Sequence, residues 1–478
     1  MIQHKKFYID GKWIDPLDGR GFDVIDPSTE EVSARISLGG KADTDRAVAA
    51  ARAAFPHWAA NPPTERLAAV QRIQNVYEKR AEEMAKAISL EMGAPIDWAC
   101  GAQTVAGSGV INDFIKSFKT FEFLREAGPR SPRTRISFHP VGVAALITPW
   151  NWPMNQITLK VIPALLAGCS MVLKPSEIAP LSALLFAEIV EEAGLPAGVF
   201  NLVNGDGGGV GSQLSAHEDV DMVSFTGSTR AGIAISSAAA ATLKKVCLEL
   251  GGNGANLIFA DAGEKTIHSG TRRVFNNSGQ SCNSPARMLV ERSIYKDAVE
   301  IARRVAEKTV VASAHEAGSH IGPVVSAAQF DKIQDLIETG IKEGARLVAG
   351  GPGRPADLKK GYFVRPTVFA DVEPGMRVQS EEIFGPVITI MPFDSEEQAI
   401  KIANDTLYGL TNYIQTADEE RRKRLAFALR SGMVETNTDP IGPDAFFGGV
   451  GFSGRARECG HWGIEEFLDA KAISGWPA

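Results

Sequence analysis

Two residues of this chain have the chemical types that covalent catalysis on a carbonyl group needs. Cys282 ends the small-residue segment 279–282 (GQSC), and Glu249 lies 33 residues earlier in segment 248–252 (LELGG). A thiolate adds readily to a carbonyl carbon, and a carboxylate can then activate water against the covalent intermediate. The pair predicts an enzyme that acts on aldehydes or acyl compounds through a thioester.

Each of the two residues also has an ordinary structural explanation. A single cysteine is most often a small buried apolar side chain, and this explanation suits Cys100, Cys169 and Cys247. The approach to Cys282, residues 276–281, is polar and flexible, which instead favours an exposed thiol whose pKa is lowered by nearby amides. Glu249 by itself would be interpreted as a solvated glutamate at the end of a strand.

A third segment offers a site for an oxyanion. Residues 148–153 (TPWNWP) follow an apolar run that predicts a strand, and the Asn151 amide could donate to a developing oxyanion. The backbone N–H of Cys282 would be the second donor. The alternative is a rigid aromatic turn with no part in catalysis.

Lys174 and Glu177 end the next predicted strand and could both reach one ribose of a dinucleotide. A carboxylate at such a position favours a free 2′-hydroxyl over a 2′-phosphate. An exposed ion pair is an equally open explanation from these two residues alone.

Two further segments could complete a dinucleotide site. Gly227 and Ser228 precede a predicted helix, whose free N–H groups could bind a pyrophosphate. In segment 381–386 (EEIFGP), Glu382 could bind a second ribose and Phe384 could flank a nicotinamide. A solvated acidic turn with a core phenylalanine is the alternative for that segment.

These residues must be positioned by an α/β framework. Short apolar strands are predicted at 141–147, 171–174, 200–203, 222–225 and 246–250, with a helix in each interval up to the last strand. This alternation predicts a parallel doubly wound sheet that binds ligands at the carboxyl ends of its strands. A second α/β series follows over 255–436. A hairpin is predicted over 7–14, and amphipathic helices around 48–58 and 67–88.

Composition limits the class of protein. The chain has 478 residues, 44% of them hydrophobic and 22% charged, and a net charge of −7 without long charged runs. These values indicate a globular protein of more than one domain, and they argue against nucleic acid or an anionic membrane as partner. The five cysteines lack metal-ligand or disulfide spacing, so we expect no metal site and a cytoplasmic location. We also expect neither a signal peptide nor a membrane span.

Taken in order, the motifs resemble the aldehyde dehydrogenase superfamily over essentially the whole chain. Each motif is weak alone, but the ordered set is specific. The matching segments are TPWNWP (148–153), LKPSE (173–177), FTGST (225–229), LELGG (248–252), GQSC (279–282) and EEIFGP (381–386).

The resemblance implies a role for each candidate residue. Cys282 would be the nucleophile, Glu249 the general base and Asn151 the oxyanion donor. Glu458 falls where the family carries a carboxylate sometimes assigned to proton relay, although a structural ion pair is as plausible. The cofactor, NAD with NADP as a possibility, would be held by Trp150, Lys174, Glu177, Gly227, Ser228, Glu382 and Phe384.

The resemblance also implies an architecture of two doubly wound Rossmann-like domains with a small β arm. The dinucleotide-binding domain would comprise 1–121 and 141–251, and the catalytic domain 252–452. Residues 122–140 and 459–478 would form an oligomerisation arm of a homodimer or homotetramer, with a surface loop as the alternative for the first segment.

The substrate would be a small-molecule aldehyde, with no residue that identifies it. Trp152, Phe114, Phe118, Phe446 and Phe447 could line an apolar entrance, although aromatic residues more often pack in a core. Three rival functions remain: a CoA-acylating dehydrogenase, a cysteine hydrolase without a dinucleotide, and a non-catalytic binding protein on the same scaffold. Glu249 argues against the CoA-acylating dehydrogenase, because a thiol acceptor needs no base for water.

Overall fold

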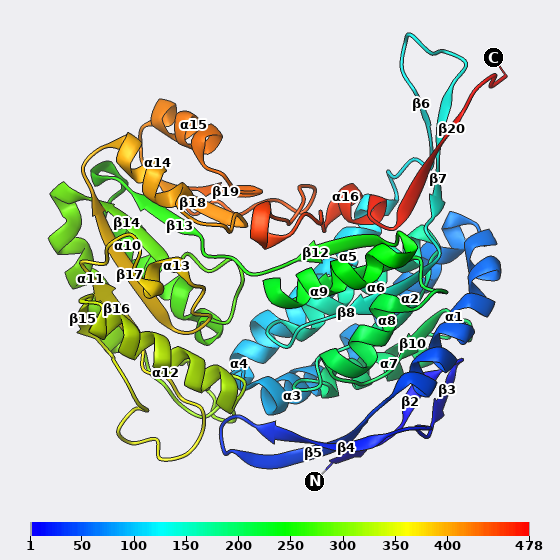
Figure 1. Ribbon diagram of the computed structural model, residues 1–478, viewed down its shortest axis with the longest axis horizontal. Helices are drawn as coiled ribbons and strands as arrows, with labels where there is room; N and C mark the ends of the chain where they lie inside the picture. The colour runs from blue at the N-terminus through cyan, green and yellow to red at the C-terminus, as the bar shows by residue number, and fades with distance from the viewer. Residues whose placement is uncertain (1, 478) are drawn as a thin grey trace.

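The computed structural model describes residues 2–477, which fold into two α/β domains and a projecting β arm (Figure 1). All-buried runs such as Val143–Ile147 and Ser170–Lys174 form parallel strands, because helices cover both faces of such strands. The predicted fold class, two Rossmann-like domains with a small β arm, is confirmed.

The first domain is built on a sheet with the strand order β12-β11-β8-β9-β10-β2-β3. Strands β8 to β12 are parallel, and the hairpin β2–β3 adds to β10 in antiparallel fashion. The strands are β2 (Phe7–Ile9), β3 (Lys12–Ile14), β8 (Val143–Ile147), β9 (Ser170–Lys174), β10 (Phe200–Leu202), β11 (Met222–Thr226) and β12 (Lys245–Glu249). The predicted hairpin and the five predicted parallel strands are therefore confirmed.

Helices on both faces of this sheet bury two apolar cores. They are α1 (Lys41–Ala60), α2 (Pro63–Lys79), α3 (Ala81–Met92), α4 (Ile96–Trp98), α5 (Thr104–Phe118), α6 (Pro153–Ala167), α7 (Leu181–Glu192), α8 (Ser212–Ala216) and α9 (Thr229–Ala239). A separate sheet, β1 (Ile2–His4), β5 (Glu31–Leu38) and β4 (Arg20–Asp26), lies at the N-terminal edge.

One predicted helix is in fact two consecutive helices, α2 and α3. The amphipathic pattern over 67–88 predicts a single helix, but the chain breaks at Arg80, whose φ of −103° and ψ of 15° are not helical. The Arg80 guanidinium pairs with Glu83 inside the segment and with Glu188 outside it, and the second pair depends on contacts far along the chain. Neither glycine nor proline marks this position, so the local sequence carries no signal for it.

The second domain repeats the α/β plan on a sheet with the order β15-β16-β17-β14-β13-β18-β19. Its strands are β13 (Ala255–Ile258), β14 (Arg287–Glu291), β15 (Arg346–Ala349), β16 (Thr367–Ala370), β17 (Val387–Phe393), β18 (Thr411–Gln415) and β19 (Met433–Thr436). Its helices are α10 (Glu264–Phe275), α11 (Tyr295–Lys308), α12 (Ala327–Lys342), α13 (Arg377–Ser380), α14 (Glu396–Asn404) and α15 (Glu419–Ala428).

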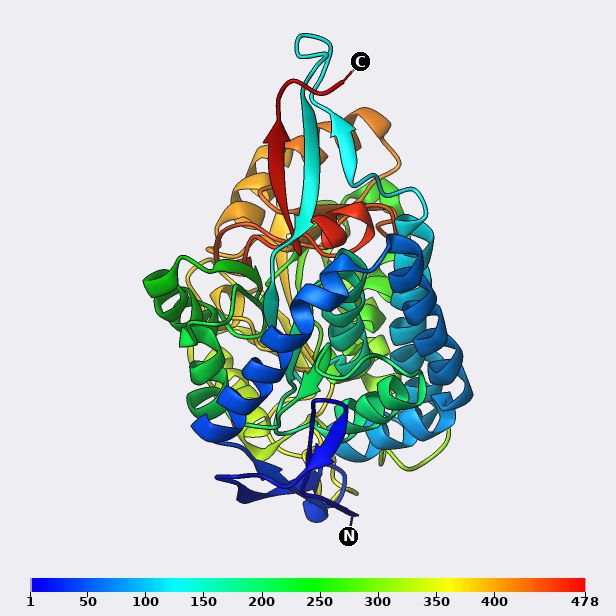
Figure 2. The same ribbon diagram turned by 90° about the vertical axis from the view of Figure 1, so that its right-hand side faces the viewer.

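The arm extends away from both domains near the C-terminus (Figures 1 and 2). It is a sheet of β20 (Leu468–Ile473), β7 (Arg135–Pro140) and β6 (Leu124–Glu126), all antiparallel. The helix α16 (Gly460–Glu465), just before β20, instead packs on the core of the first domain through Ile464. The division of the chain into domains and the role of the arm remain predictions.

Candidate active site between the two domains

Cys282 lies in a tight turn that follows α10 in the second domain. Asn277 and Ser278 both adopt left-handed backbone angles, with φ of 53° and 55°. Gly279 has a φ of 76°, and a Cβ there would lie 1.9 Å from the Gly385 carbonyl oxygen. This position therefore requires glycine, and the turn leaves the Cys282 side chain half-buried.

The side-chain amides of Gln103 and Asn277 hold Asn151 beside this turn. Asn151 Nδ2 donates to the Gln280 carbonyl oxygen at 3.1 Å. Gln103 Nε2 donates to the Asn151 carbonyl oxygen at 3.1 Å and to Asn277 Oδ1 at 2.9 Å. Asn277 Nδ2 also donates to the Asn151 carbonyl oxygen, at 3.0 Å. An amide carries two N–H donors, so Asn151 keeps one for a ligand beside Cys282.

Glu249 is the last residue of β12 and is 2% exposed. Among the described residues, neither of its carboxylate oxygens has a hydrogen-bond partner. Burial and the negative charge of Glu458 both raise the pKa of the Glu249 carboxyl well above its usual value. Glu458 itself is paired with the buried Lys160. An unpartnered, buried carboxyl of this kind is unusual in a purely structural position.

The structure corrects the expected ionisation of Cys282. Nearby amides were expected to lower its pKa, but burial raises the pKa of the thiol, and the charge of Glu249 raises it further. The Asn283 backbone N–H opposes this shift and is outweighed. The charge of Glu249 therefore acts on the Cys282 thiol, as expected if the two side chains share one site.

Polar side chains without partners gather at the carboxyl edge of the first sheet. Among residues 2–477, the buried hydroxyls of Thr148 and Thr226 and the whole side-chain amide of Asn204 lack hydrogen-bond partners. They follow or end β8, β11 and β10, so they lie along the edge where doubly wound sheets bind ligands. Buried groups of this type suit a polar ligand.

The predicted ribose and pyrophosphate residues end neighbouring elements. Lys174, at the end of β9, is buried and pairs with Glu177 at 3.0 Å. Ser228 is the N-cap of α9, and its hydroxyl accepts the Ala231 N–H at 3.3 Å. Gly227 bonds back to the Glu249 carbonyl oxygen at 3.0 Å, which joins this turn to β12.

Glu382 and Phe384 come from the second domain and meet the first. Glu382 Oε1 accepts the Gly252 N–H at 2.7 Å, and burial raises the pKa of this carboxyl to about 7. Phe384 has a φ of 58°, and its ring stands edge-on to the Trp150 ring with 5.5 Å between centroids. Cys282, Glu382 and Phe384 line one narrow pocket.

Aromatic side chains flank the cysteine turn. Trp152 donates from Nε1 to the Ser281 hydroxyl at 2.9 Å and packs on Trp98 with 6.1 Å between ring centroids. Phe446 packs instead on Trp462 of α16, with 5.5 Å between ring centroids. Phe114 and Phe118, which were also considered for an apolar entrance, are instead buried in the core of the first domain.

Three contributors were missed by sequence analysis. Gln103 and Asn277 are polar residues in segments that the motifs did not include. Lys160 carried a usable signal, because a lone lysine in an otherwise apolar helix such as α6 needs a buried partner. That partner is Glu458.

Comparison with known proteins identifies the family. The model of the aldehyde dehydrogenase family matches residues 13–473. A Pseudomonas sp. protein named 3-succinoylsemialdehyde-pyridine dehydrogenase is 47% identical over 478 residues, which cover 100% of this chain and 99% of that protein.

Two solved structures are similar over nearly their whole length. The crystal structure of aldehyde dehydrogenase from Bartonella henselae has 60% identity and a TM-score of 0.99, with 100% of both chains covered. Aldehyde dehydrogenase C from Pseudomonas syringae, a cysteine-to-alanine mutant in complex with NAD+ and octanal, has 46% identity and a TM-score of 0.97, with 99% of this chain and 97% of that chain covered. The chain therefore belongs to the aldehyde dehydrogenase family, which makes it an NAD(P)-dependent oxidoreductase acting on aldehydes, as the motifs predicted.

Proposed function

We propose that this protein oxidises an apolar aldehyde to the carboxylic acid with NAD+ as cofactor, and that Cys282 is the nucleophile. The observation that carries the proposal is the buried Glu249 carboxyl, which has no hydrogen-bond partner among the described residues. Its charge raises the pKa of the Cys282 thiol, and the Asn151 amide bonds to the turn that contains this thiol. This combination provides a nucleophile, a base and an oxyanion donor in one site.

The residues along the two domain edges suit NAD. Thr148, Thr226 and Asn204 leave buried polar atoms free at the carboxyl edge of the sheet. Lys174 and Glu177 are expected to bind the adenosine ribose, and Glu177 favours NAD over NADP. Trp150, Gly227 and Ser228 would line the site, while Glu382 and Phe384 would hold the nicotinamide ribose end. When bound, NAD+ supplies the acceptor for the hydride that leaves the substrate carbon.

In the first covalent step, the Cys282 thiol loses its proton to solvent, the thiolate sulfur bonds to the aldehyde carbon, and the carbonyl oxygen takes the negative charge as the C=O double bond becomes a single bond. We expect the second Asn151 N–H and the Cys282 backbone N–H to stabilise that oxygen. Removing one such donor in a comparable site costs about 10²–10³ in turnover. After oxidation the acyl group is held on Cys282 as a thioester, which remains electrophilic.

Glu249 would then take a proton from water, and the hydroxide would displace Cys282 to release the acid. A base with a raised pKa is matched to proton transfer near neutral pH. Glu458 leaves one oxygen, Oε2, without a partner among the described residues, which suits it for passing the proton onward. Lys160 holds Glu458 in position, and its charge opposes the burial that raises the pKa of the Glu458 carboxyl.

The surroundings of Cys282 favour an apolar aldehyde over a semialdehyde with a free carboxylate. Trp152, which bonds to Ser281 of the turn, and Trp98, which packs on Trp152, are half-buried aromatic side chains. Arg457 bonds to the Gly449 and Ala456 carbonyl oxygens. Its guanidinium is therefore engaged by backbone, which leaves it poorly placed to hold a substrate carboxylate. The octanal complex of the Pseudomonas syringae protein is consistent with an apolar substrate.

The experiment that tests this proposal is Cys282→Ala. The variant should form no NADH from octanal or any other aldehyde, because no other thiol can replace the nucleophile, and it should bind NAD+ as tightly as the wild type. Absorbance of the reduced nicotinamide measures turnover, and titration of intrinsic fluorescence measures cofactor binding.

The matched control is Cys100→Ala, which removes an exposed thiol and should leave turnover unchanged. NADH formation by Cys282→Ala at the wild-type rate would refute the role of Cys282. A product that forms only when CoA is present would show that the acyl group passes to CoA and is not released by hydrolysis.

A further inference from the structure

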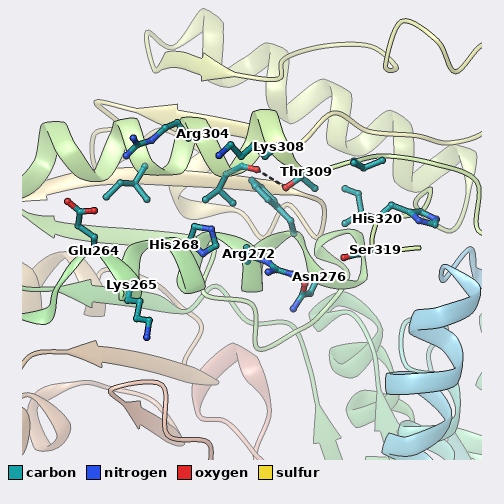
Figure 3. Close-up of a pocket in the computed structure, with 15 residues that line it drawn as sticks. Glu264, Lys265, His268, Arg272, Asn276, Arg304, Lys308, Thr309, Ser319 and His320 are labelled. Atoms are coloured by element: carbon teal, nitrogen blue, oxygen red, sulfur yellow. Dashed lines mark hydrogen bonds between the residues drawn. The ribbon is translucent and has the colours of Figure 1, made fainter. Parts of the chain in front are cut away.

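A second cavity, of about 600 Å³, lies in the catalytic half of the molecule between α10, α11 and residues 309–321 (Figure 3). It shares no lining residue with the pocket that contains Cys282. The volume falls within the range of about 300–1,000 Å³ that is typical of small-molecule sites. The cavity is therefore large enough to hold a ligand of its own.

Basic side chains line this cavity from two facing helices. Lys265, His268 and Arg272 recur at helical spacing along one face of α10, and Arg304 and Lys308 lie one turn apart on α11 (Figure 3). Glu264 is the single acidic residue in the lining. This positive lining contrasts with the net charge of −7 for the whole chain.

Four of these basic side chains have no partner. Among residues 2–477, Lys265, His268, Arg272 and Lys308 make no side-chain hydrogen bond and no ion pair, while Arg303, on another face of α11, pairs with acidic neighbours. Like charges placed close together repel, and an anion between them would remove that cost.

Helix stability does not explain the arrangement. Arg272 and Lys308 lie in the last turns of their helices, where cations interact favourably with the helix dipole. Lys265, however, lies in the first turn of α10, where a positive charge is unfavourable.

The cavity also has an apolar floor. Phe275, Ile301, Val305 and Ile321 are buried residues of the lining, and Val310, also in the lining, is 58% exposed. A simple inorganic anion would leave this apolar surface unused. A ligand that carries several charges on a flat, partly apolar body would use both.

We propose that this cavity binds a nucleotide-class polyanion, with its phosphates on Arg272 and Lys308 and its base over Val305. The site is separate from the proposed cofactor site, which lies along the sheet of the first domain. Asn276 lines the cavity and also opens the turn that leads to Cys282. A bound nucleotide would thus contact the segment that positions the nucleophile.

The test is a calorimetric titration of ATP into the full-length protein that has been saturated with NAD+, so that the cofactor site is occupied. We expect one ATP to bind per chain, and adenosine and tripolyphosphate to bind more weakly than ATP. The double variant Arg272→Glu/Lys308→Glu should weaken ATP binding by at least about tenfold, since two attractive charges become repulsive.

The matched control is Lys296→Glu/Lys119→Glu, which changes the net charge equally at exposed lysines outside the cavity. It should leave ATP binding unchanged, and both double variants should bind NAD+ normally. Equal loss of binding in the two double variants would overturn the proposal, as would the absence of ATP binding. Tripolyphosphate binding as tight as ATP, or binding of poly-glutamate alone, would also overturn it.

Discussion

The Cys282 thiol lies in surroundings that disfavour its charged form. Burial raises its pKa, and the charges of Glu249, Glu382 and Glu458 act in the same direction. A neutral thiol is a weak nucleophile and resists oxidation. In the protein without cofactor and substrate, Cys282 is therefore expected to be a neutral, unreactive thiol. It should become reactive only when cofactor and substrate change its surroundings.

A pH series of alkylation tests this ionisation. An unperturbed cysteine has a pKa of about 8.5, so its alkylation rate levels off above that pH. The pKa of Cys282 is raised, so its thiolate fraction keeps growing, and inactivation by iodoacetamide should still accelerate beyond pH 9. The measurement is loss of aldehyde oxidation with time, in a Cys100→Ala background that lacks the exposed thiol. A plateau near pH 7 would show that the thiol is activated in the free protein.

Glu249→Gln separates the two halves of the proposed reaction. The amide cannot accept a proton from water, so the thioester should accumulate on Cys282 after a single oxidation. We expect a burst of one NADH per active site, followed by steady-state turnover about 10²–10⁴ lower than the wild type. Stopped-flow absorbance measures both phases, and mass spectrometry of the trapped protein measures the acyl adduct. Steady turnover at the wild-type rate would show that Glu249 is not the base that activates water.

The wild-type pH profile should follow from the same carboxyl. Deacylation needs the ionised form, and a raised pKa keeps Glu249 protonated to higher pH than an ordinary glutamate. Steady-state turnover should therefore fall on the acid side at a pH well above about 4.3, the usual pKa of glutamate. The burst of NADH should not follow that limb, because it precedes the step that requires Glu249.

At the level of elements, the site depends on how a helix of one domain meets a turn of the other. Gln103 ends a π-helical turn, Ala99–Gln103, directly before α5, and π-helical turns of this kind often occur at functional sites. Its fully buried amide spans Asn151 in the first domain and Asn277 in the second. Gln103 thereby fixes the oxyanion donor relative to the nucleophile turn.

Gln103→Leu should therefore lower kcat by about tenfold or more and change the KM for aldehyde less. It leaves Asn277 Oδ1 without its donor in a buried position, which should also cost about 1–3 kcal/mol of stability. Steady-state kinetics and thermal unfolding measure the two effects. Val105→Ala, at an exposed position in the next turn, is the control and should change neither. A loss of stability without any loss of kcat would make Gln103 a structural residue only.

The elements themselves were largely predictable from sequence, whereas their contacts were not. Alternating apolar strands and helices predicted the sheet of the first domain because parallel strands buried on both faces are continuously apolar. The break at Arg80 was not predictable, because Glu188, from a distant segment, stabilises it. The pKa of Cys282 was missed for a similar reason. Its flanking residues are polar, and the burial comes from elements far along the chain.

At the scale of the whole molecule, the projecting β arm has no evident function within a single chain. Strand β20 pairs with β7 from Leu468 opposite Pro140 to Ile473 opposite Arg135, and four of its residues are exposed. The neighbouring strand β6 exposes Leu124 at 43%. A two-sided, exposed sheet that extends away from the body is marginal alone and gains stability by packing on another chain. On this physical basis we predict a homodimer or homotetramer.

Ending the chain after Phe467 tests this assembly, because it removes β20 and leaves β7 with a free edge. Sedimentation velocity should show the full-length protein as a dimer or tetramer, and the shortened protein should shift to at most half that mass. A chain that ends after Ile473 keeps the strand and is the matched control, which should assemble normally. Both shortened proteins should still bind NAD+, since α16 and the first core remain in place. Unchanged assembly after loss of β20 would assign the subunit contacts to the two domains and leave the arm without that role.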